Sequence, residues 1–257
     1  MNKQLVLLEK VLREAGEKLL AQKVVVSKHK TKNDLLTEND VAIENFIVDK
    51  LKKLDPTAEI LSEENYSDGN LTGRCYVIDP IDGTCNFAAN LPHFGIQVAY
   101  FENGECIASI LYFPKTGDVL TAALGEGTHL NGKLIRVDSN ADSSDGFLII
   151  SDYYDEINIP MHKQFALVQS LQSHFLKTRH FGAACVDFSL LACGNALTYV
   201  CYYSKIWDIA PGLLIAKEAG CVYSSLDGSS YKYGNAGLVV ANNEHNLNIV
   251  LNEFIKL

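Results

Sequence analysis

The chain has 257 residues, of which 47% are hydrophobic and 21% are charged, so the composition predicts a globular protein and excludes a disordered or fibrous one. Its 22 basic and 31 acidic side chains give a net charge of −9, which argues against a nucleic acid or an anionic membrane surface as partner. The longest apolar runs are strand-sized. They are much shorter than the roughly 18 residues of a membrane-spanning helix.

The amino-terminal residues lack the basic and apolar segments of a signal peptide, which predicts a cytoplasmic location. The seven cysteines are odd in number and contain no C-x-x-C pair. We therefore expect buried, reduced thiols rather than disulfides or a metal centre.

The first third of the chain predicts two helices. Apolar residues spaced by three and four predict an amphipathic helix over residues 4–21. The basic stretch at 23–32 is interpreted as a solvated, mobile loop. Thr37, with Asp40 three residues later, resembles a helix start, and the helix is expected to end before Asp55-Pro56.

The middle of the chain predicts strands, and the last part predicts alternating strands and helices. Short apolar runs between residues 59 and 124 predict an antiparallel meander, with a hairpin turn at Asn103-Gly104. The turn at 138–146 predicts a boundary between a first domain, 1–142, and a second, 143–257. In the second domain we expect strands at 147–151, 177–181, 197–203, 221–224 and 237–241 and helices at 161–173, 185–194, 208–219 and 243–256.

The hexapeptide Asp79-Pro80-Ile81-Asp82-Gly83-Thr84 is the most informative motif. Its two carboxylates follow an apolar strand, and α/β folds usually bind ligands at such strand ends. Gly83-Thr84 is expected to begin a helix whose free N–H groups face an anion. A D-x-x-D pattern after a strand also occurs as a simple turn and helix cap, so the motif alone leaves both interpretations open.

Further carboxylates lie at the ends of other predicted elements: Glu63-Glu64 after a strand, Asp208 at a helix start and Asp40 near the start of the second helix. Taken singly, these are ordinary surface or N-cap residues. Together they form a set of hard oxygen donors in a chain without a His pair at ligand spacing. This set favours Mg²⁺ and argues against zinc.

Several competing chemistries have no candidate residues. The chain contains no G-x-S-x-G elbow, no C-x5-R phosphate loop and no D-x-D-x-T run. The G-x4-G-K match at 127–133 is followed by Leu134 instead of Ser or Thr, and Asn131-Gly132 is better interpreted as a hairpin turn. Phosphatase routes through a covalent enzyme intermediate are therefore not expected.

With these motifs, the chain resembles the inositol monophosphatase family of Mg²⁺-dependent, lithium-sensitive phosphomonoesterases. The resemblance extends over nearly the whole sequence. It is carried by the following segments: 34–37 with Asp40, 62–64, V-I-D-P-I-D-G-T-C-N-F at 77–87, Arg179 with 182–184 and Asp187, and W-D-I-A-P-G at 207–212 leading to 218–220.

The resemblance implies a five-layer αβαβα sandwich of the sugar-phosphatase type, an α/β (α+β) fold with an antiparallel or mixed sheet first and a smaller mixed α/β half second. It implies a homodimer and two or three Mg²⁺ ions, with Mn²⁺ as a possible substitute. The implied metal ligands are Glu63, Asp79, the Ile81 carbonyl, Asp82 and Asp208.

By the same resemblance, Asp40 and Thr84 activate a water molecule, and Glu63 belongs to the catalytic set. Gly83, Thr84, Asp82 and Ala183 line the phosphate and substrate site. Two positions bear on the substrate. Cys201 stands where inositol phosphatases carry a glutamate that contacts a sugar hydroxyl. Lys205 is placed to meet a second phosphate or is simply solvated. Which of Lys28, His29 and Lys30 serves the mobile loop is left open.

The expected function is therefore Mg²⁺-dependent hydrolysis of a small phosphomonoester: an inositol monophosphate, a sugar phosphate or a nucleotide phosphate. No covalent enzyme intermediate is expected. One alternative is a bisphosphate phosphatase acting on fructose 1,6-bisphosphate, 3′-phosphoadenosine 5′-phosphate or the 2′-phosphate of NADP. A second alternative is a non-catalytic regulatory homologue. The expected partner is a small phosphorylated substrate, with no nucleic acid and no membrane.

Overall fold

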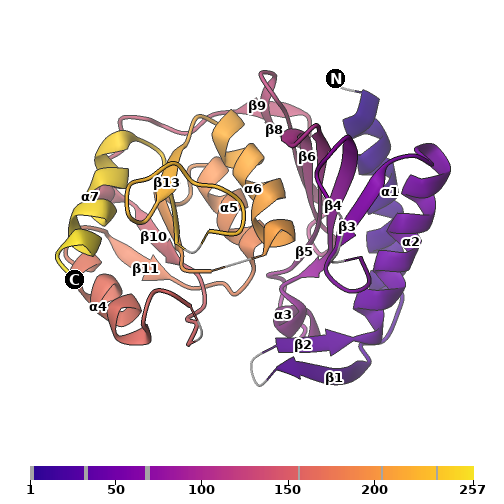
Figure 1. Ribbon diagram of the computed structural model, residues 1–257, viewed down its shortest axis with the longest axis horizontal. Coiled ribbons are helices and arrows are strands. Elements are labelled where there is room, and N and C mark those ends of the chain that lie inside the picture. Colours follow the sequence, from indigo (N-terminus) through magenta and orange to yellow (C-terminus); the bar gives the residue numbers. More distant parts are fainter. Residues whose placement is uncertain (1–2, 32–33, 67–69, 156, 204, 236) are drawn as a thin grey trace.

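Helices and sheets alternate in five layers in the computed structural model, which describes residues 3–31, 34–66, 70–155, 157–203, 205–235 and 237–257 (Figure 1). The outer layer beside the first sheet contains α1 (Lys3–Leu20) and α2 (Glu38–Leu54). The central layer contains α5 (Ala184–Ala192) and α6 (Ile206–Glu218), and the last contains α4 (Met161–Leu171) and α7 (Glu244–Ile255). The order αβαβα is the one expected from the sequence.

The first sheet has seven strands in sequence order among the described residues. The strands are β3 (Glu59–Ser62), β4 (Arg74–Asp82), β5 (Gly95–Glu102), β6 (Glu105–Phe113), β7 (Asp118–Ala123), β8 (Gly127–Leu130) and β9 (Lys133–Ile135). The predicted hairpin turns are confirmed: Asn103 and Asn131 have φ angles of 51° and 50°, and each is followed by a glycine with positive φ.

The prediction of an entirely antiparallel meander was wrong, because β3 pairs with β4 in parallel. Parallel strands cannot be joined by a tight hairpin turn, so a meander pattern read from the sequence does not predict this pair. The end of β4 also differs from the prediction, since the strand continues through Asp79 and Pro80 to Asp82. The register with β5 shifts between Asp79 and Asp82, so the motif lies in an irregular strand end rather than after the strand.

The second sheet has five strands in the order β11-β10-β12-β14-β13. Its strands are β10 (Phe147–Ile150), β11 (Lys177–Arg179), β12 (Thr198–Cys201), β13 (Val222–Ser225) and β14 (Leu238–Ala241). β10 pairs in parallel with β11 and β12, and β14 pairs antiparallel with β12 and β13. The predicted alternation of strands and helices in this half is confirmed.

A two-stranded hairpin of β1 (Val26–Thr31) and β2 (Asp34–Thr37) precedes α2, and the short helix α3 (Thr84–Ala88) lies near it (Figure 1). The prediction of a loop at 23–32 was therefore wrong for residues 26–31. Alternation of polar residues without an apolar face gives no strand signal in sequence, and only the partner strand defines this one. The side chains of Lys28, His29 and Lys30 lie outside the described residues.

Three apolar clusters fill the spaces between the five layers. One packs α1 and α2 on the first sheet, the second surrounds α5 and α6 between the sheets, and the third packs α4 and α7 on the second sheet. Leu8, Leu12 and Leu19 have no exposed surface, as the spacing in α1 predicts. All seven cysteines are free thiols, but Cys85 is exposed and Cys193 half-buried, so the prediction of burial was wrong for these two.

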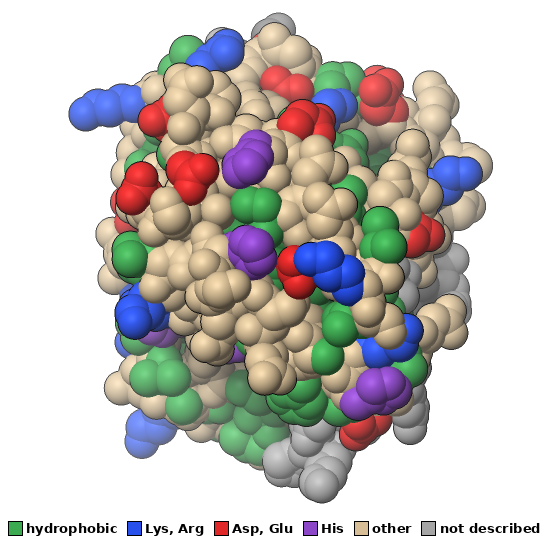
Figure 2. Space-filling view, turned by 90° about the vertical axis from the view of Figure 1, so that its left-hand side faces the viewer, with side chains coloured by type: hydrophobic (Ala, Val, Ile, Leu, Met, Phe, Trp, Pro, Cys, Tyr) green, Lys and Arg blue, Asp and Glu red, His purple; other side chains and the backbone are tan. Residues whose placement is uncertain are grey.

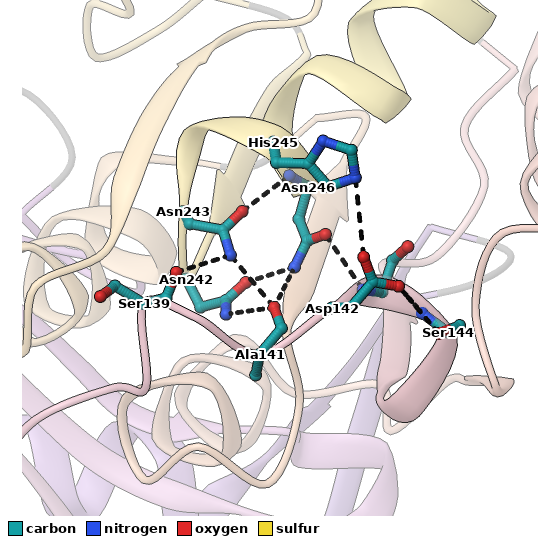
Figure 3. A network of polar contacts seen from close by, with 9 residues as sticks. Ser139, Ala141, Asp142, Ser144, Asn242, Asn243, His245 and Asn246 are labelled. Carbon is teal, nitrogen blue, oxygen red and sulfur yellow. Dashed lines mark hydrogen bonds and ion pairs between the residues drawn. The ribbon is translucent and has the colours of Figure 1, made fainter.

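The segment between the two sheets is fixed to the start of α7 by a network of asparagine side chains (Figure 3). The Asn242 amide donates to the Asp138 carbonyl at 2.7 Å, and the Asn246 amide donates to the Ala141 carbonyl at 3.1 Å. The short 3₁₀ turn η1 (Ser143–Asp145) follows, and the Ser143 N–H donates to Asn246. The proposed division at 142/143 falls in this fixed connection and stays a prediction.

The described part of the face formed by α4 and α7 carries scattered acidic, basic and histidine side chains without a continuous basic area (Figure 2). This agrees with the net negative charge of the chain. No helix among the described residues is long and apolar enough to cross a membrane.

Candidate active site

Asp79 on β4 lies at the centre of the candidate site and is only 1% exposed. Its Oδ1 accepts a hydrogen bond from the Ile81 N–H at 3.1 Å, and its Oδ2 accepts one from the Gln97 amide at 3.4 Å. Burial raises the pKa of Asp79 well above its ordinary value, and the charges of Glu63, Asp82 and Asp208 raise it further. The fold therefore brings three further predicted ligands, Glu63, Asp82 and Asp208, within electrostatic reach of Asp79.

Asp82 ends β4 and contacts the amino-terminal end of α5. Its Oδ1 accepts a hydrogen bond from the Ala184 N–H at 3.2 Å, and its Oδ2 accepts one from the Cys185 N–H. Burial raises the pKa of Asp82, whereas these two N–H bonds lower it. The carboxylate thus satisfies free backbone donors at the positive end of the helix dipole, an interaction between distant segments that sequence reasoning missed.

Asp40 and Thr84 meet at the starts of α2 and α3. Asp40 is fully buried, and its Oδ2 accepts hydrogen bonds from the Thr37 N–H at 2.8 Å and from the Thr37 hydroxyl at 2.5 Å. This capping box confirms the predicted helix start. The Thr84 hydroxyl is within hydrogen-bond distance of both Asp40 Oδ1, at 3.0 Å, and the Ile81 carbonyl, at 2.9 Å.

Gly83 provides the turn that joins β4 to α3. Its φ angle is +88°, and a Cβ at this position would lie 2.8 Å from the His93 carbonyl oxygen and 2.9 Å from the Ala183 Cβ. The backbone therefore requires glycine here. The close approach also places Ala183, a predicted substrate-site residue, directly beside Gly83.

Asp208 lies in the first turn of α6, although not at the N-cap. Lys205 is the N-cap, and its backbone N–H donates to Asp208 Oδ2 at 2.9 Å. The Asp208 charge contributes to the raised pKa of Tyr154 and of Tyr231, for which burial is the largest cause. Two tyrosines thus lie within electrostatic reach of Asp208.

Cys201 is the last residue of β12 and is only 1% exposed. Its thiol donates to the Tyr203 carbonyl at 3.5 Å. Cys201 and Asp208 both contribute to the raised pKa of Tyr154 and of Tyr231, so Cys201 belongs to the same neighbourhood. Lys205 is exposed, and its ammonium lies 5.3 Å from the centre of the Tyr203 ring.

Sequence reasoning missed Gln97 beside the carboxylates and gave no site role to Asp187, although Asp187 belongs to the segments that carry the resemblance. Gln97 on β5 is fully buried and donates to Asp79 and Asp82, the latter at 3.2 Å, whereas its carbonyl oxygen has no hydrogen-bond partner. Asp187 on α5 is 2% exposed, and burial raises its pKa well above the ordinary value. A lone glutamine inside an apolar strand was the available signal for Gln97.

The donor set fits a hard divalent cation in type. The buried Asp79 carboxylate, whose pKa the charges of Glu63, Asp82 and Asp208 raise, is stabilised in its ionised form when a cation neutralises it. Among the described residues, however, no three His, Cys, Asp or Glu side chains are arranged to hold a metal ion directly. The oxygens of Asp79, Asp82 and Asp208 instead accept backbone N–H bonds. The ligand assignments therefore stay predictions.

Two surface cavities lie elsewhere. One of about 380 Å³ lies between the β5–β6 turn and α6, and one of about 410 Å³ lies beside the end of α7. None of the predicted site residues lines either of them.

Nearly the whole chain matches a family model. Residues 3–255 fit the model of the inositol monophosphatase family. The chain belongs to the inositol monophosphatase family. Membership in this family makes it a phosphatase by class and confirms the resemblance seen in the motifs.

Individual relatives agree with this assignment. The chain is 30% identical over 237 residues to a fructose-1,6-bisphosphatase/inositol-1-monophosphatase of Thermotoga maritima, covering 91% of this chain and 89% of that protein. It is 31% identical over 223 residues to the Nus factor SuhB of Escherichia coli K12, covering 85% and 82%. A solved IMPase structure from Thermotoga maritima superposes with a TM-score of 0.87 at 29% identity, covering 99% of each chain.

Proposed function

We propose that this family member hydrolyses a small phosphate monoester with the help of Mg²⁺. The observation that carries the proposal is the buried Asp79 carboxylate, whose pKa is raised by the charges of Glu63, Asp82 and Asp208. Two residues further along the chain, the Ile81 carbonyl lies within hydrogen-bond distance of the Thr84 hydroxyl. Such a cluster repels a phosphate dianion unless cations neutralise it. Bound Mg²⁺ supplies that neutralisation, polarises the phosphoryl oxygens and lowers the pKa of water.

Thr84 and Asp40 are proposed to receive the proton of the attacking water. A hydroxyl has one proton, so Thr84 donates either to the Ile81 carbonyl or to Asp40. When it donates to Asp40, the lone pairs of its oxygen can accept a hydrogen bond from water. Asp40 is held for this contact by its two bonds from Thr37.

The phosphate group is proposed to bind at the turn between β4 and α3. Gly83 and Thr84 supply backbone N–H groups that can bind an anion. Because Gly83 has no Cβ, the anion can approach the backbone closely. The carboxylates and the Ile81 carbonyl would hold the cations, which would neutralise the charge of the phosphate. No residue of the chain needs to form a covalent bond to phosphorus.

Released phosphate tests this proposal. We expect wild-type protein to release phosphate from inositol monophosphate, sugar phosphates or nucleotide monophosphates in Mg²⁺ and to lose this activity in chelator. Asp82→Asn should lose it even in Mg²⁺, whereas Asp227→Asn, at an exposed position away from the site, should retain it. Equal turnover by wild type and Asp82→Asn would refute the metal assignment.

A second candidate function is a non-catalytic binding protein, which the SuhB relative named as a Nus factor favours. The presence of every proposed site residue counts against it. Calorimetric titration that detects tight binding of a phosphorylated ligand or protein partner, with no phosphate released over hours, would favour this function over catalysis.

The number of bound ions, the response to lithium and the oligomeric state are proposed on the family resemblance alone. We propose two or three Mg²⁺ ions, with Mn²⁺ as a substitute, lithium sensitivity and a homodimer. A cytoplasmic location is supported by the free state of all seven cysteines, because reducing compartments keep thiols free. The alternative substrates are fructose 1,6-bisphosphate, 3′-phosphoadenosine 5′-phosphate and the 2′-phosphate of NADP.

A further inference from the structure

Glu44 on α2 is a fully buried carboxylate to which four hydrogen bonds converge. Its Oε2 accepts bonds from the Ser62 hydroxyl, from the Glu64 N–H at 2.9 Å and from the Asn65 N–H at 3.4 Å. Its Oε1 accepts a bond from the Asn65 side-chain amide at 2.5 Å. All four donors belong to one short segment, residues 62–65, which begins at the last residue of β3.

This segment is the turn that contains Glu63. The turn is closed by a bond of 3.1 Å from the Ser62 N–H to the Tyr66 carbonyl. The donors to Glu44 lie on both sides of Glu63 in the chain, one before it and three after it. The Glu44 carboxylate therefore fixes the backbone on both sides of Glu63.

The same helix also positions the other half of the site. Asp40 lies one turn before Glu44 on α2, so the two carboxylates extend from the same face. Asp40 contacts Thr84, and Glu44 holds the turn of Glu63. One rigid element thus sets the spacing between the proposed proton acceptor and a proposed cation ligand.

We propose that Glu44 is a positioning residue, which holds Glu63 in place for binding of a divalent cation; this inference rests on the proposed function. A carboxylate suits the task because it only accepts hydrogen bonds and can match four donors. A glutamine at this position would direct its own N–H₂ group at one of those donors. An alanine would leave all four donors without this partner.

The test compares cation binding by variants of the full chain. Metal-free wild type, Glu44→Gln and Glu44→Ala are titrated with Mn²⁺ by calorimetry. Val48→Ala is the matched control, since Val48 is buried one turn further along α2 in the apolar cluster. We expect affinity to fall about tenfold to a hundredfold in Glu44→Ala and less in Glu44→Gln, because residues that orient ligands typically contribute this much. Val48→Ala should bind as wild type does.

Activity gives a second readout. The Mg²⁺ concentration for half-maximal phosphate release should rise by the same factor as the dissociation constant, with kcat at saturating Mg²⁺ close to wild type. Ser62→Ala removes one donor and leaves Glu44 in place, so it should weaken Mn²⁺ binding slightly even if the Glu44 variants do not fold.

The possible failures are distinguishable. Wild type that binds no Mn²⁺ would overturn the proposed function and this inference together. Wild type that binds Mn²⁺ with the same affinity as the Glu44 and Ser62 variants would overturn this inference alone. An equal loss of affinity in Val48→Ala would also overturn it, because the effect would then come from general destabilisation of α2.

Discussion

The Thr84 hydroxyl lies 3.0 Å from the Asp40 carboxylate and joins the first turn of α3 to the first turn of α2. The two residues are 44 positions apart in the sequence. Asp40 is fully buried and fixed by Thr37, so the contact is made by a carboxylate that has little freedom to move. Its predicted role as proton acceptor can therefore be tested with small substitutions.

Asp40→Asn should lower kcat about 10²- to 10⁴-fold, the usual contribution of a positioned general base, with a smaller change in KM. The asparagine keeps an oxygen that can cap α2, so the fold should be retained. Steady-state phosphate release at saturating Mg²⁺ measures the effect. Thr84→Val should cause a comparable loss and Thr84→Ser should not, because serine keeps the hydroxyl. Equal activities of the valine and serine variants would contradict the assignment.

Gly83→Ala should destabilise the protein more than Gly104→Ala. Both glycines have nearly the same positive φ, +88° and +86°, but a Cβ at Gly104 meets nothing within 4 Å. Gly104→Ala should therefore cost only the backbone strain, about 1 kcal/mol. Gly83→Ala adds contacts with the His93 carbonyl and Ala183, at about 1 to 3 kcal/mol more. Urea unfolding of both variants compares the two costs, and equal losses would contradict the close packing at Gly83.

Asp187→Asn should stabilise the protein increasingly as pH rises. The raised pKa of Asp187 is caused first by burial and then by the Asp82 charge. The contribution of the protonated Asp187 side chain to folding stability is therefore fully present below the ordinary pKa of 3.8. It is lost as pH rises through the raised pKa of the folded state. Each unit of upward shift corresponds to about 1.4 kcal/mol. Urea unfolding at several pH values from roughly 4 to 8 measures the difference in stability between the two proteins.

Asp118→Asn is the control of opposite sign for this pH series. Hydrogen bonds from Asn131 and then Thr116 lower the pKa of Asp118. Its contribution is present above its ordinary pKa and is lost as pH falls through the lower folded-state pKa. The variant should therefore be less stable than wild type at neutral pH and approach it in acid. The same trend for Asp187→Asn would disprove the burial effect.

Mg²⁺ should stabilise the wild-type protein against unfolding. Binding to the folded state alone contributes about 2.7 kcal/mol at a concentration one hundred times the dissociation constant. Asp79→Asn should lose this response, and it should be more stable than wild type in chelator because the buried charge is removed. Thermal unfolding with and without Mg²⁺ at constant ionic strength measures both effects. A variant that responds to Mg²⁺ as wild type does would exclude Asp79 as a ligand.

Lys205→Ala should distinguish bisphosphate from monophosphate substrates. Lys205 is exposed beside the start of α6, next to Asp208, where its ammonium can reach a second phosphate. Loss of such a charged contact should lower kcat/KM about tenfold for a bisphosphate and leave a monophosphate unaffected. A panel of the proposed substrates measures this, with Lys115→Ala as control. An equal effect on both substrate types would refute contact with a second phosphate.

The helices and turns that depend on local residue preferences were predictable from the sequence. The leucine spacing of α1, the capping box at Thr37 and the Asn-Gly turns are formed by residues within a few positions of one another, so neighbouring side chains and backbone dihedrals decide them. The types of donor in the site were also evident, because Asp79, Asp82 and Gly83-Thr84 lie in one motif.

Contacts between distant segments were decided only by the tertiary structure. The parallel pairing of β3 with β4, the strand formed by residues 26–31 and the bonds from Asp82 to α5 each need a partner that no local pattern specifies. Glu44 looks like an ordinary helical glutamate until the turn of Glu63 is packed against it. The sequence by itself determined which chemical groups are present. Packing determined which of them meet, because hydrogen bonds between distant residues form only after apolar burial has brought their elements together.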